Sequence, residues 1–147
     1  MSPTVGVVVV NYNGGERVLR VLQALEAQSY GLHEILVVDN ASSDGTPAAI
    51  RARFPAVRLI ELPDNLGLSV ARNVGLQELH STLALSLDHD IYVDPECIDL
   101  LVRAHLATNA TVICPRIRLL PERETVHADG ASVRLSGGMW LISSAAA

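Results

Sequence analysis

Hydrophobic runs alternate with polar clusters along most of the chain. Three of these runs, Val5 to Val10, Ile35 to Val38 and Leu83 to Leu87, are aliphatic and short enough to be strands. Such runs are typical of strands that are buried on both faces of a parallel sheet. Each run ends in a polar cluster, and the three clusters are Asn11-Tyr12-Asn13, Asp39-Asn40 and Asp88-His89-Asp90. Open α/β sheets bind ligands beyond the carboxyl ends of their strands, so these clusters mark the expected binding edge.

Helices are predicted between the strands, and the alternation predicts the fold. The predicted helices cover residues 16–28, 46–54, 68–79 and 95–107, and two more strands are expected over 57–62 and 111–114. Thr46 is expected to cap the second helix, and Asp94-Pro95 to open the fourth. Strands that alternate with helices predict a Rossmann-like, mostly parallel sheet with helices on both faces.

The domain boundaries follow from where this pattern weakens. Residues 1–115 are expected to form an α/β domain. Residues 116–147 are expected to form a partial segment or an irregular tail of the same domain. A β-excursion with turns at residues 121–122 and 129–130 is one form that this segment could take.

Composition and charge narrow the class of protein. The chain has 147 residues and a formal net charge of −5, which argues against nucleic acid as a partner because phosphate binding needs a basic face. No apolar run approaches the roughly 20 residues of a transmembrane segment. A cytoplasmic protein is therefore expected, with a location at the membrane periphery as the alternative. Cys97 and Cys114 are too far apart in sequence for a CxxC pair and are expected to be free thiols.

Asp88 and Asp90 are the sharpest candidates for metal binding. Two carboxylates separated by one residue at the end of a buried strand can face one hard cation, and Mg²⁺ or Mn²⁺ completes its shell with water and diphosphate. The alternative interpretation is a pair of solvated loop acids. His89 is expected to point away from them, with metal ligation by His89 as the lesser alternative.

Asp39 and Arg72 are the other candidates. A carboxylate at the position of Asp39 can accept hydrogen bonds from a base or a ribose, or it can cap its own loop through Asn40 and Ser42. Arg72 lies near a predicted helix start, where the N–H groups also favour an anion. It could contact a diphosphate, or it could pair with Glu78 or with an acid on the neighbouring loop. Gly75, in the middle of the same helix, suggests close packing against the sheet.

Four motifs in order resemble a known family. The chain contains VVVVNYNGGERVLRVLQAL, ILVVDNASSDGT, NLGLSVARNVG and LSLDHDIYVDPE at residues 7–25, 35–46, 65–75 and 85–96. Together they resemble the nucleotide-sugar-binding half of the family 2 glycosyltransferases, which are inverting enzymes of the GT-A nucleotide-diphospho-sugar transferase fold. The rhamnosyltransferase-like branch is one candidate within that family. The resemblance covers residues 4 to 115 and makes residues 1–115 a nucleotide-sugar-binding domain.

The resemblance implies roles for the nucleoside side of the site. Asn11 and Tyr12 would line the base pocket, and Asp39 would bind the base. Arg72 would approach the base or the diphosphate. The implied ligand is a nucleoside-diphosphate sugar donor.

The resemblance also implies a metal and a reaction. Asp88 would sit near the ribose and could share the metal, while Asp90 would ligate Mg²⁺ or Mn²⁺. The enzyme would transfer the sugar to an acceptor hydroxyl with inversion. An inverting transfer needs a base, and no acidic motif after Asp90 matches the one that the family uses, so the catalytic residue stays unassigned. Compared with the family, the chain is expected to be truncated at its C-terminal end, and the resemblance implies that residues 116–147 are a partial acceptor-side segment, with an irregular tail as the alternative.

Two other functions compete with this one. A truncated, non-catalytic nucleotide-sugar-binding or assembly module would bind the donor without transferring the sugar. A nucleotidyltransferase is less favoured, because its first loop is Gly-rich and basic whereas residues 11–15 contain no Lys or Arg. The acceptor class stays open among a glycan, a lipid and a small molecule. A homo-oligomer is also expected, since a truncated chain would expose apolar surface.

Overall fold

The computed structural model describes residues 2–118, 126–128, 131–133 and 139–141. Their contacts form two compact units, Met1–Leu100 and Leu101–Ala147. The first unit contains a sheet with three helices, and helix α4 (Cys97–Thr108) spans the boundary between the units. The described residues of the second unit include four short strands. The predicted domain boundary at residue 115 stays a prediction.

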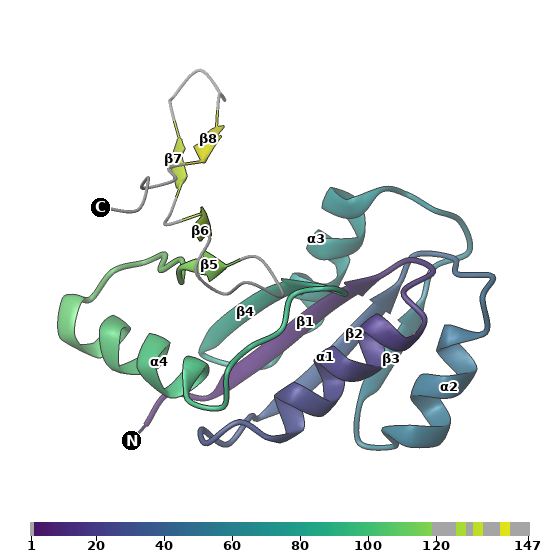
Figure 1. Cartoon of the computed structure of the whole chain (residues 1–147), viewed down its shortest axis with the longest axis horizontal. Helices are drawn as coiled ribbons and strands as arrows, with labels where there is room; N and C mark the ends of the chain where they lie inside the picture. The colour runs from purple at the N-terminus through teal and green to yellow at the C-terminus, as the bar shows by residue number, and fades with distance from the viewer. Residues whose placement is uncertain (1, 119–125, 129–130, 134–138, 142–147) are drawn as a thin grey trace. The chain divides into compact units, whose positions relative to one another are not determined.

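The first unit is built on a four-stranded parallel sheet (Figure 1). Its strands are β1 (Val5–Asn11), β2 (Glu34–Asp39), β3 (Arg58–Glu61) and β4 (Leu83–Asp88), in the spatial order β3-β2-β1-β4. Every residue of β1 is buried, as expected for a central strand that carries a continuous valine run. The register places Asn11 beside Asp39 on one neighbour and Val10 beside Asp88 on the other.

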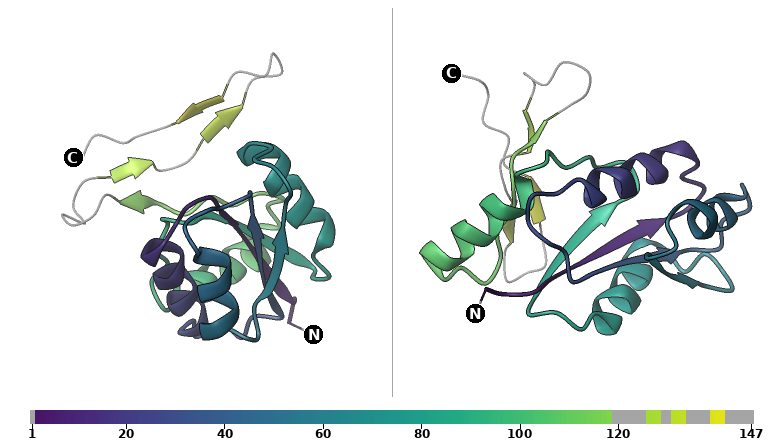
Figure 2. Two further views of the ribbon diagram at one scale, coloured as in Figure 1. Left: turned by 90° about the vertical axis from the view of Figure 1, so that its right-hand side faces the viewer. Right: turned by 90° about the horizontal axis from the view of Figure 1, so that it is seen from below.

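Helices cover both faces of this sheet. Figure 2 shows α1 (Glu16–Glu26) and α2 (Thr46–Arg53) on one side of the strands and α3 (Leu68–Glu78) on the other. Parallel strands need long crossover connections, and these are usually helices. The crossover helices account for the alternating pattern of the sequence. The predicted Rossmann-like parallel sheet with helices on both faces is confirmed.

Helix α3 packs unusually close to the sheet. A Cβ atom added at Gly75 would lie 2.4 Å from Cγ1 of Val8, closer than real carbon atoms approach, and 3.0 Å from Cγ2 of Val38. Val8, Val10, Leu36 and Val38 form a core cluster with Ala71, the other small residue on this face of α3. The predicted close packing at Gly75 is therefore confirmed, and space is the reason that a helix-weakening glycine stands there.

Three local predictions are wrong. Thr46 does not cap α2: Gly45, with φ 80°, occupies that position, and the Thr46 hydroxyl accepts a hydrogen bond from Gly15 N at 3.0 Å. Helix α4 begins at Cys97 rather than at Pro95, because Asp94 to Cys97 first form a turn in which Cys97 N donates to the Asp94 carbonyl.

The third wrong prediction is the strand over residues 111–114, which have no strand structure. Its β-branched residues favour a strand only where a sheet offers them a packed surface, and the side chain of Val112 is 83% exposed.

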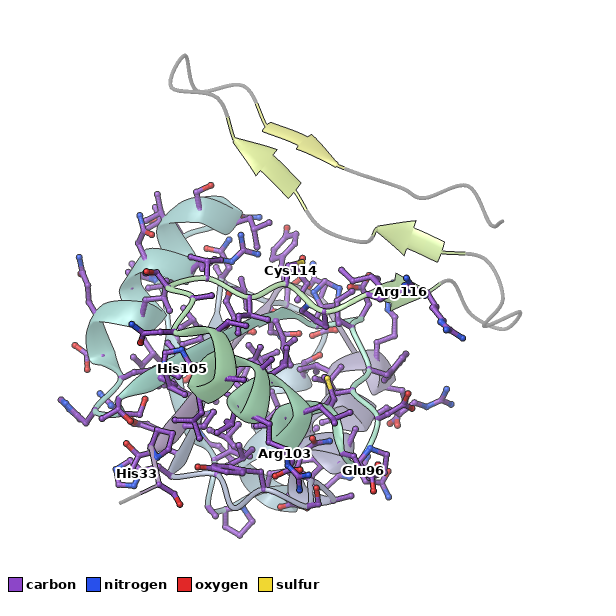
Figure 3. The ribbon with its side chains drawn as sticks, turned by 90° about the vertical axis from the view of Figure 1, so that its left-hand side faces the viewer. His33, Glu96, Arg103, His105, Cys114 and Arg116 are labelled. Carbon is purple, nitrogen blue, oxygen red and sulfur yellow. The ribbon has the colours of Figure 1, made fainter. Side chains whose placement is uncertain are left out.

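The second unit is described by its local pairings. Strand β5 (Ile117–Arg118) pairs antiparallel with β6 (Val126–Ala128), and β7 (Ala131–Val133) pairs antiparallel with β8 (Met139–Leu141). The turns predicted at residues 121–122 and 129–130 lie outside the described residues. Helix α4 ends at Thr108, and Asn109 follows it with a left-handed φ of 54°. The ring of His105 (labelled in Figure 3) bonds the Ala110 carbonyl at 3.0 Å. An asparagine in this conformation commonly terminates a helix.

Two predicted properties can be checked directly. Cys97 and Cys114 are free thiols, as expected. In the part of the chain that the structure describes, no helix has the length and apolar character that crossing a membrane would require.

The close approach at Gly75 yields the first testable prediction. Replacing Gly75 with valine forces side-chain atoms into the space held by Val8 and Val38. Overpacking of this kind costs about 1–3 kcal/mol. The free energy of unfolding, measured in urea, should therefore fall by about that amount. Gly31→Val is the matched control, because nothing lies within 4 Å of a Cβ atom at Gly31. Equal stability of the two variants would contradict the packing described for α3.

Candidate functional site

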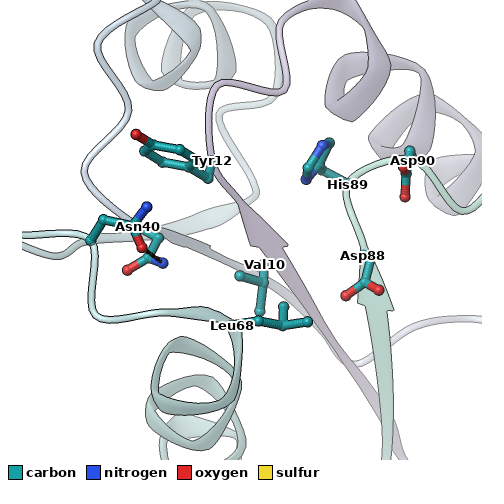
Figure 4. A pocket seen from close by; sticks show the side chains of 8 residues that line it. Val10, Tyr12, Asn40, Leu68, Asp88, His89 and Asp90 are labelled. Carbon is teal, nitrogen blue, oxygen red and sulfur yellow. Dashed lines mark hydrogen bonds between the residues drawn. The ribbon is translucent and has the colours of Figure 1, made fainter.

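A pocket of about 330 Å³ lies at the carboxyl edge of the sheet. Figure 4 shows Asp88, His89 and Asp90 on one side of it, Tyr12 and Asn40 on the other, and Val10 and Leu68 between them. Its walls come from the ends of β1, β2 and β4 and from the loop between β3 and α3. The lining residues are Val10, Tyr12, Asn40, Asn65, Leu68, Asp88, His89 and Asp90. The edge predicted from the strand-end clusters therefore carries a pocket.

Asp88 faces the side of the sheet that α3 covers. It lies beside Val10, a member of the cluster that packs on α3, and its Oδ1 accepts a hydrogen bond from Nη2 of Arg72 at 2.6 Å. Arg72 thus pairs with an acid, which was the alternative to a diphosphate contact in the sequence analysis. The partner is the strand-end acid rather than Glu78, which pairs with Arg58.

The Arg72–Asp88 pair is partly screened from water. The side chains are 32% and 41% exposed, so the attraction is stronger than that of a fully solvated pair, although solvent still screens it. Nε of Arg72 and the hydroxyl of Ser86 are buried without a hydrogen-bond partner in the described residues. The guanidinium is held at one end only, which leaves it able to exchange partners.

Asp90 stands in a tight turn at the end of β4. Ile91 N donates to the Asp88 carbonyl at 3.2 Å, with His89 and Asp90 at the centre of the turn. Asp90 is exposed, and its carboxylate makes no hydrogen bond or ion pair within the described residues. No group of three or more potential ligands from His, Cys, Asp and Glu occurs in the described part of the chain.

The two carboxylates fit one kind of metal. Mg²⁺ and Mn²⁺ sites that serve phosphate chemistry use one or two protein carboxylates and take their other ligands from water and phosphate. Asp88 and Asp90 supply such a donor set, with Oδ2 of Asp88 outside the Arg72 pair. A structural zinc site, which needs four protein ligands, does not fit.

The prediction that His89 points away from the two acids stays a prediction. His89 lines the same pocket as they do, and its ring lies close to Gly14 of the loop that follows β1. A Cβ atom added at Gly14 would meet Cδ2 and Cγ of His89 at 3.2 and 3.3 Å. The sequence gives no sign of this contact, because the two residues are far apart along the chain.

Asp39 and Asn11 meet at the end of β1 and β2 but do not line the pocket. Asn11 Nδ2 donates to Asp39 Oδ1 at 2.6 Å, and Ser42 donates to both carboxylate oxygens of Asp39 through its hydroxyl and its amide, at 2.6 and 2.8 Å. Asp39 is 1% exposed and Asn11 is fully buried. The bonds with Ser42 fit the alternative interpretation of Asp39, in which it caps its own loop. The predicted contact with a base stays a prediction.

Two asparagines that received no role from the sequence, Asn40 and Asn65, join the loops of the pocket. Asn40 Nδ2 donates to Asn65 Oδ1 at 2.7 Å, and Asn40 Oδ1 accepts from Leu66 N at 2.9 Å. Asn40 directly follows β2 and Asn65 lies in the loop after β3, and loops that follow strands are where the binding edge was expected, so their positions were a usable signal. Together they hold the β2–α2 and β3–α3 loops as one wall.

Asp44 supports the loop between β1 and α1 by accepting a hydrogen bond from Gly15 N. Its slight burial acts to raise its pKa, but hydrogen bonding with Thr46 and with the Gly15 amide outweighs this, and the pKa falls below its ordinary value of 3.8. A carboxyl whose pKa is lower in the folded state stabilises the fold above its unfolded pKa. That contribution is lost as the pH falls through the folded value. Asp44 is therefore structural, as predicted.

The site residues predicted from sequence fall into two groups. Tyr12, Asp88 and Asp90 line the pocket, and Arg72 joins it through Asp88. Asn11 and Asp39 form a separate hydrogen-bonded group beside it.

Comparison with known sequences identifies a family. A sequence profile described as Glycosyl transferase family 2 matches residues 6–126. The succinoglycan biosynthesis protein ExoO of Rhizobium meliloti (strain 1021) is 32% identical over 134 residues, which is 90% of this chain and 37% of that protein. An N-acetylglucosaminyl-diphospho-decaprenol L-rhamnosyltransferase of Mycobacterium tuberculosis (strain ATCC 25618 / H37Rv) is 37% identical over 79 residues, 54% of this chain and 26% of that protein. The chain thus spans 26–37% of the length of these two relatives.

Solved structures agree on the fold. The mannosyltransferase PcManGT from Pyrobaculum calidifontis, in complex with GDP-Man and Mn²⁺, matches with a TM-score of 0.65 and 30% identity over 76% of this chain and 34% of that one. S. aureus TarS 1-349 in complex with UDP matches with a TM-score of 0.65 and 21% identity over 80% of this chain and 42% of that one. At that lower identity the likeness concerns the fold alone.

The Asp39 network yields a prediction about stability. Asp39→Ala leaves the Asn11 amide and the Ser42 amide without their acceptor in a buried setting. Each unsatisfied group costs about 1–3 kcal/mol, so the free energy of unfolding in urea should drop clearly. Asp64→Ala, which removes an exposed acid from the loop after β3, should leave it unchanged. If both variants are as stable as the unaltered chain, Asp39 does not hold its loop.

Proposed function

This chain belongs to glycosyl transferase family 2, and on that premise we propose that its strand-end pocket binds a nucleoside-diphosphate sugar donor together with a divalent cation. The observation that carries the proposal is the pocket itself, which brings Tyr12, Asp88 and Asp90 together at the carboxyl edge of a parallel sheet. This is the edge at which α/β sheets of this kind bind nucleotides. Two of the structural relatives named above were solved with nucleotide ligands.

Asp88 and Asp90 are proposed to hold Mg²⁺ or Mn²⁺. Their carboxylates line one wall, and Asp90 has no competing partner within the described residues. When bound, the cation would offset the negative charge that develops on a diphosphate leaving group. The mannosyltransferase complex that contains Mn²⁺ supports the use of a divalent metal.

The opposite wall is proposed to take the nucleoside. Tyr12 presents a side chain that is 44% exposed, so its ring is available to pack against a base. Asn40 and Asn65 already bond each other and the following backbone, which makes this wall preorganised. Asn11 and Asp39 would support this wall through the loop that they hold. A direct contact of Asp39 with the base is part of the proposal.

Arg72 is proposed to contact the diphosphate. Its guanidinium pairs with Asp88 through a single nitrogen, and a diphosphate offers oxygens that can accept two parallel bonds from arginine. Donor binding would then draw Arg72 from Asp88 and free both oxygens of that carboxylate for the cation.

The reaction is proposed to be transfer of the sugar to an acceptor hydroxyl with inversion at the anomeric carbon. This follows from the family resemblance. The acceptor, the homo-oligomer and a location in the cytoplasm or at the membrane periphery stay predictions.

Metal-dependent donor binding is the central test. Calorimetric titration with UDP-, GDP- and dTDP-sugars should detect binding of at least one donor, and Mn²⁺ should tighten it. Asp90→Asn, which keeps the shape and removes the charge, should weaken the effect of Mn²⁺ by at least the roughly 10–100-fold that losing an outer-shell partner costs a metal site.

The control for this test is Glu26→Gln, which removes an exposed acid at the end of α1. It should bind donor and metal like the unaltered chain. If none of the donors binds with or without Mn²⁺, the proposed function is wrong.

A nucleotide-sugar-binding module without transfer activity is the second candidate. The titratable side chains among the described pocket residues, apart from Tyr12, all come from the single turn of Asp88, His89 and Asp90. If the metal and the diphosphate occupy these groups, the described lining has no carboxylate left to deprotonate an acceptor. Incubation of the 147-residue chain with the donor that binds, followed by detection of the released nucleoside diphosphate, separates the two. Turnover or donor hydrolysis would exclude the module.

A further inference from the structure

The ring of His89 lies close to Gly14, in the loop after β1, at a position where a larger residue would be crowded. A Cβ atom on Gly14 would lie 2.2 Å from Oδ1 of Asn11, and 3.2 and 3.3 Å from Cδ2 and Cγ of the His89 ring. Gly14 is buried and is not among the glycines with a positive φ. The position therefore requires glycine for lack of space rather than for backbone conformation.

The loop that carries Gly14 is firmly held. Asn13 N donates to Ser42 Oγ at 2.9 Å, and Asn13 Oδ1 accepts from Ser43 N at 2.9 Å. On the other side of Gly14, the amide of Gly15 donates to Asp44 at 3.1 Å and to Thr46 at 3.0 Å. Gly14 thus offers His89 a surface that is fixed to the β2–α2 loop.

The turn that carries the acids has few other attachments. Its backbone is closed by the bond from Ile91 N to the Asp88 carbonyl, and Arg72 holds Asp88 on the α3 side. Neither the ring nitrogens of His89 nor the carboxylate of Asp90 makes a hydrogen bond within the described residues. Within the described residues, the closeness of the His89 ring to Gly14 brings the middle of the turn next to the opposite loop.

We propose that His89 is a positioning residue, whose ring rests on Gly14 and thereby sets where Asp90 meets the cation of the bound donor. The inference rests on the proposed function and adds to it a link between the two loops that flank the pocket. Removing the ring frees the turn to move about its Asp88 attachment, so Asp90 spends less time in the geometry that the metal requires. The ring acts by its shape, so an aromatic substitute should replace it and its nitrogens should be dispensable.

The test measures Mn²⁺ binding, not turnover. The 147-residue chain is titrated with Mn²⁺ in the presence of saturating UDP or GDP, and free Mn²⁺ is followed by electron paramagnetic resonance. His89→Ala should raise the dissociation constant for Mn²⁺ about 10-fold, the lower end of what outer-shell losses cost metal sites. His89→Phe should bind Mn²⁺ like the unaltered chain.

Two further variants separate positioning from general damage. His33→Ala removes an exposed histidine that precedes β2, at the opposite edge of the sheet (Figure 3), and should have no effect. Gly14→Ala crowds the ring and, more strongly, Oδ1 of Asn11, which lies 2.2 Å from the added Cβ atom. It should weaken Mn²⁺ binding as His89→Ala does, and it should also lower the unfolding midpoint. Thermal unfolding of each variant, with an unchanged midpoint for His89→Ala, shows that the loss is local.

The outcomes are distinct. Equal Mn²⁺ binding by His89→Ala and the unaltered chain would overturn the role of His89 and leave the proposed function standing. Weak binding by His89→Phe would also overturn it, because the ring nitrogens would then be required. If the unaltered chain binds no Mn²⁺ with either nucleotide, the proposed function fails and this inference fails with it.

Discussion

The parallel register of β1 with its two neighbours is the constraint on which the site depends. It places Asn11 level with Asp39 and Val10 level with Asp88. Side chains alternate between the faces of a strand, so a shift of one residue would turn Asp88 away from Arg72 and Asn11 away from Asp39. A fully buried β1 resists such a shift, because every valine would have to exchange its packing partners. The hydrophobic core therefore fixes the polar geometry at the strand ends.

Beyond the strands, the binding edge is held by loops that bond one another. Asp39 and Ser42 support the loop after β1, while Asn40 and Asn65 join the next two loops. Buried polar groups are costly unless they are paired, so each loop is stable chiefly in the presence of the others. Such cross-linking leaves the pocket largely formed before a ligand arrives, which reduces the ordering cost of binding.

Charge is arranged unevenly across this edge. Asp88 has Arg72 as its partner, whereas Asp90 has none within the described residues. Two neighbouring carboxylates with one guanidinium leave a local negative charge, and a divalent cation would neutralise it. The ring of His89, between them in sequence, lies close to Gly14. The turn thus combines one paired acid, one acid without a partner in the described residues and one ring close to the loop after β1.

The sequence by itself determined the parallel α/β fold, the binding edge and most of the acids at it, because hydrophobic runs and the polar residues that end them are local signals. The close packing at Gly75 was also readable, since a glycine inside a helix needs a reason. Only the tertiary structure decided that Arg72 pairs with Asp88, that Asp39 bonds its own loop, and that His89 rests on Gly14. It also overruled the strand at 111–114 and the cap at Thr46. These outcomes depend on which distant side chains meet, and residue spacing along one chain does not specify that.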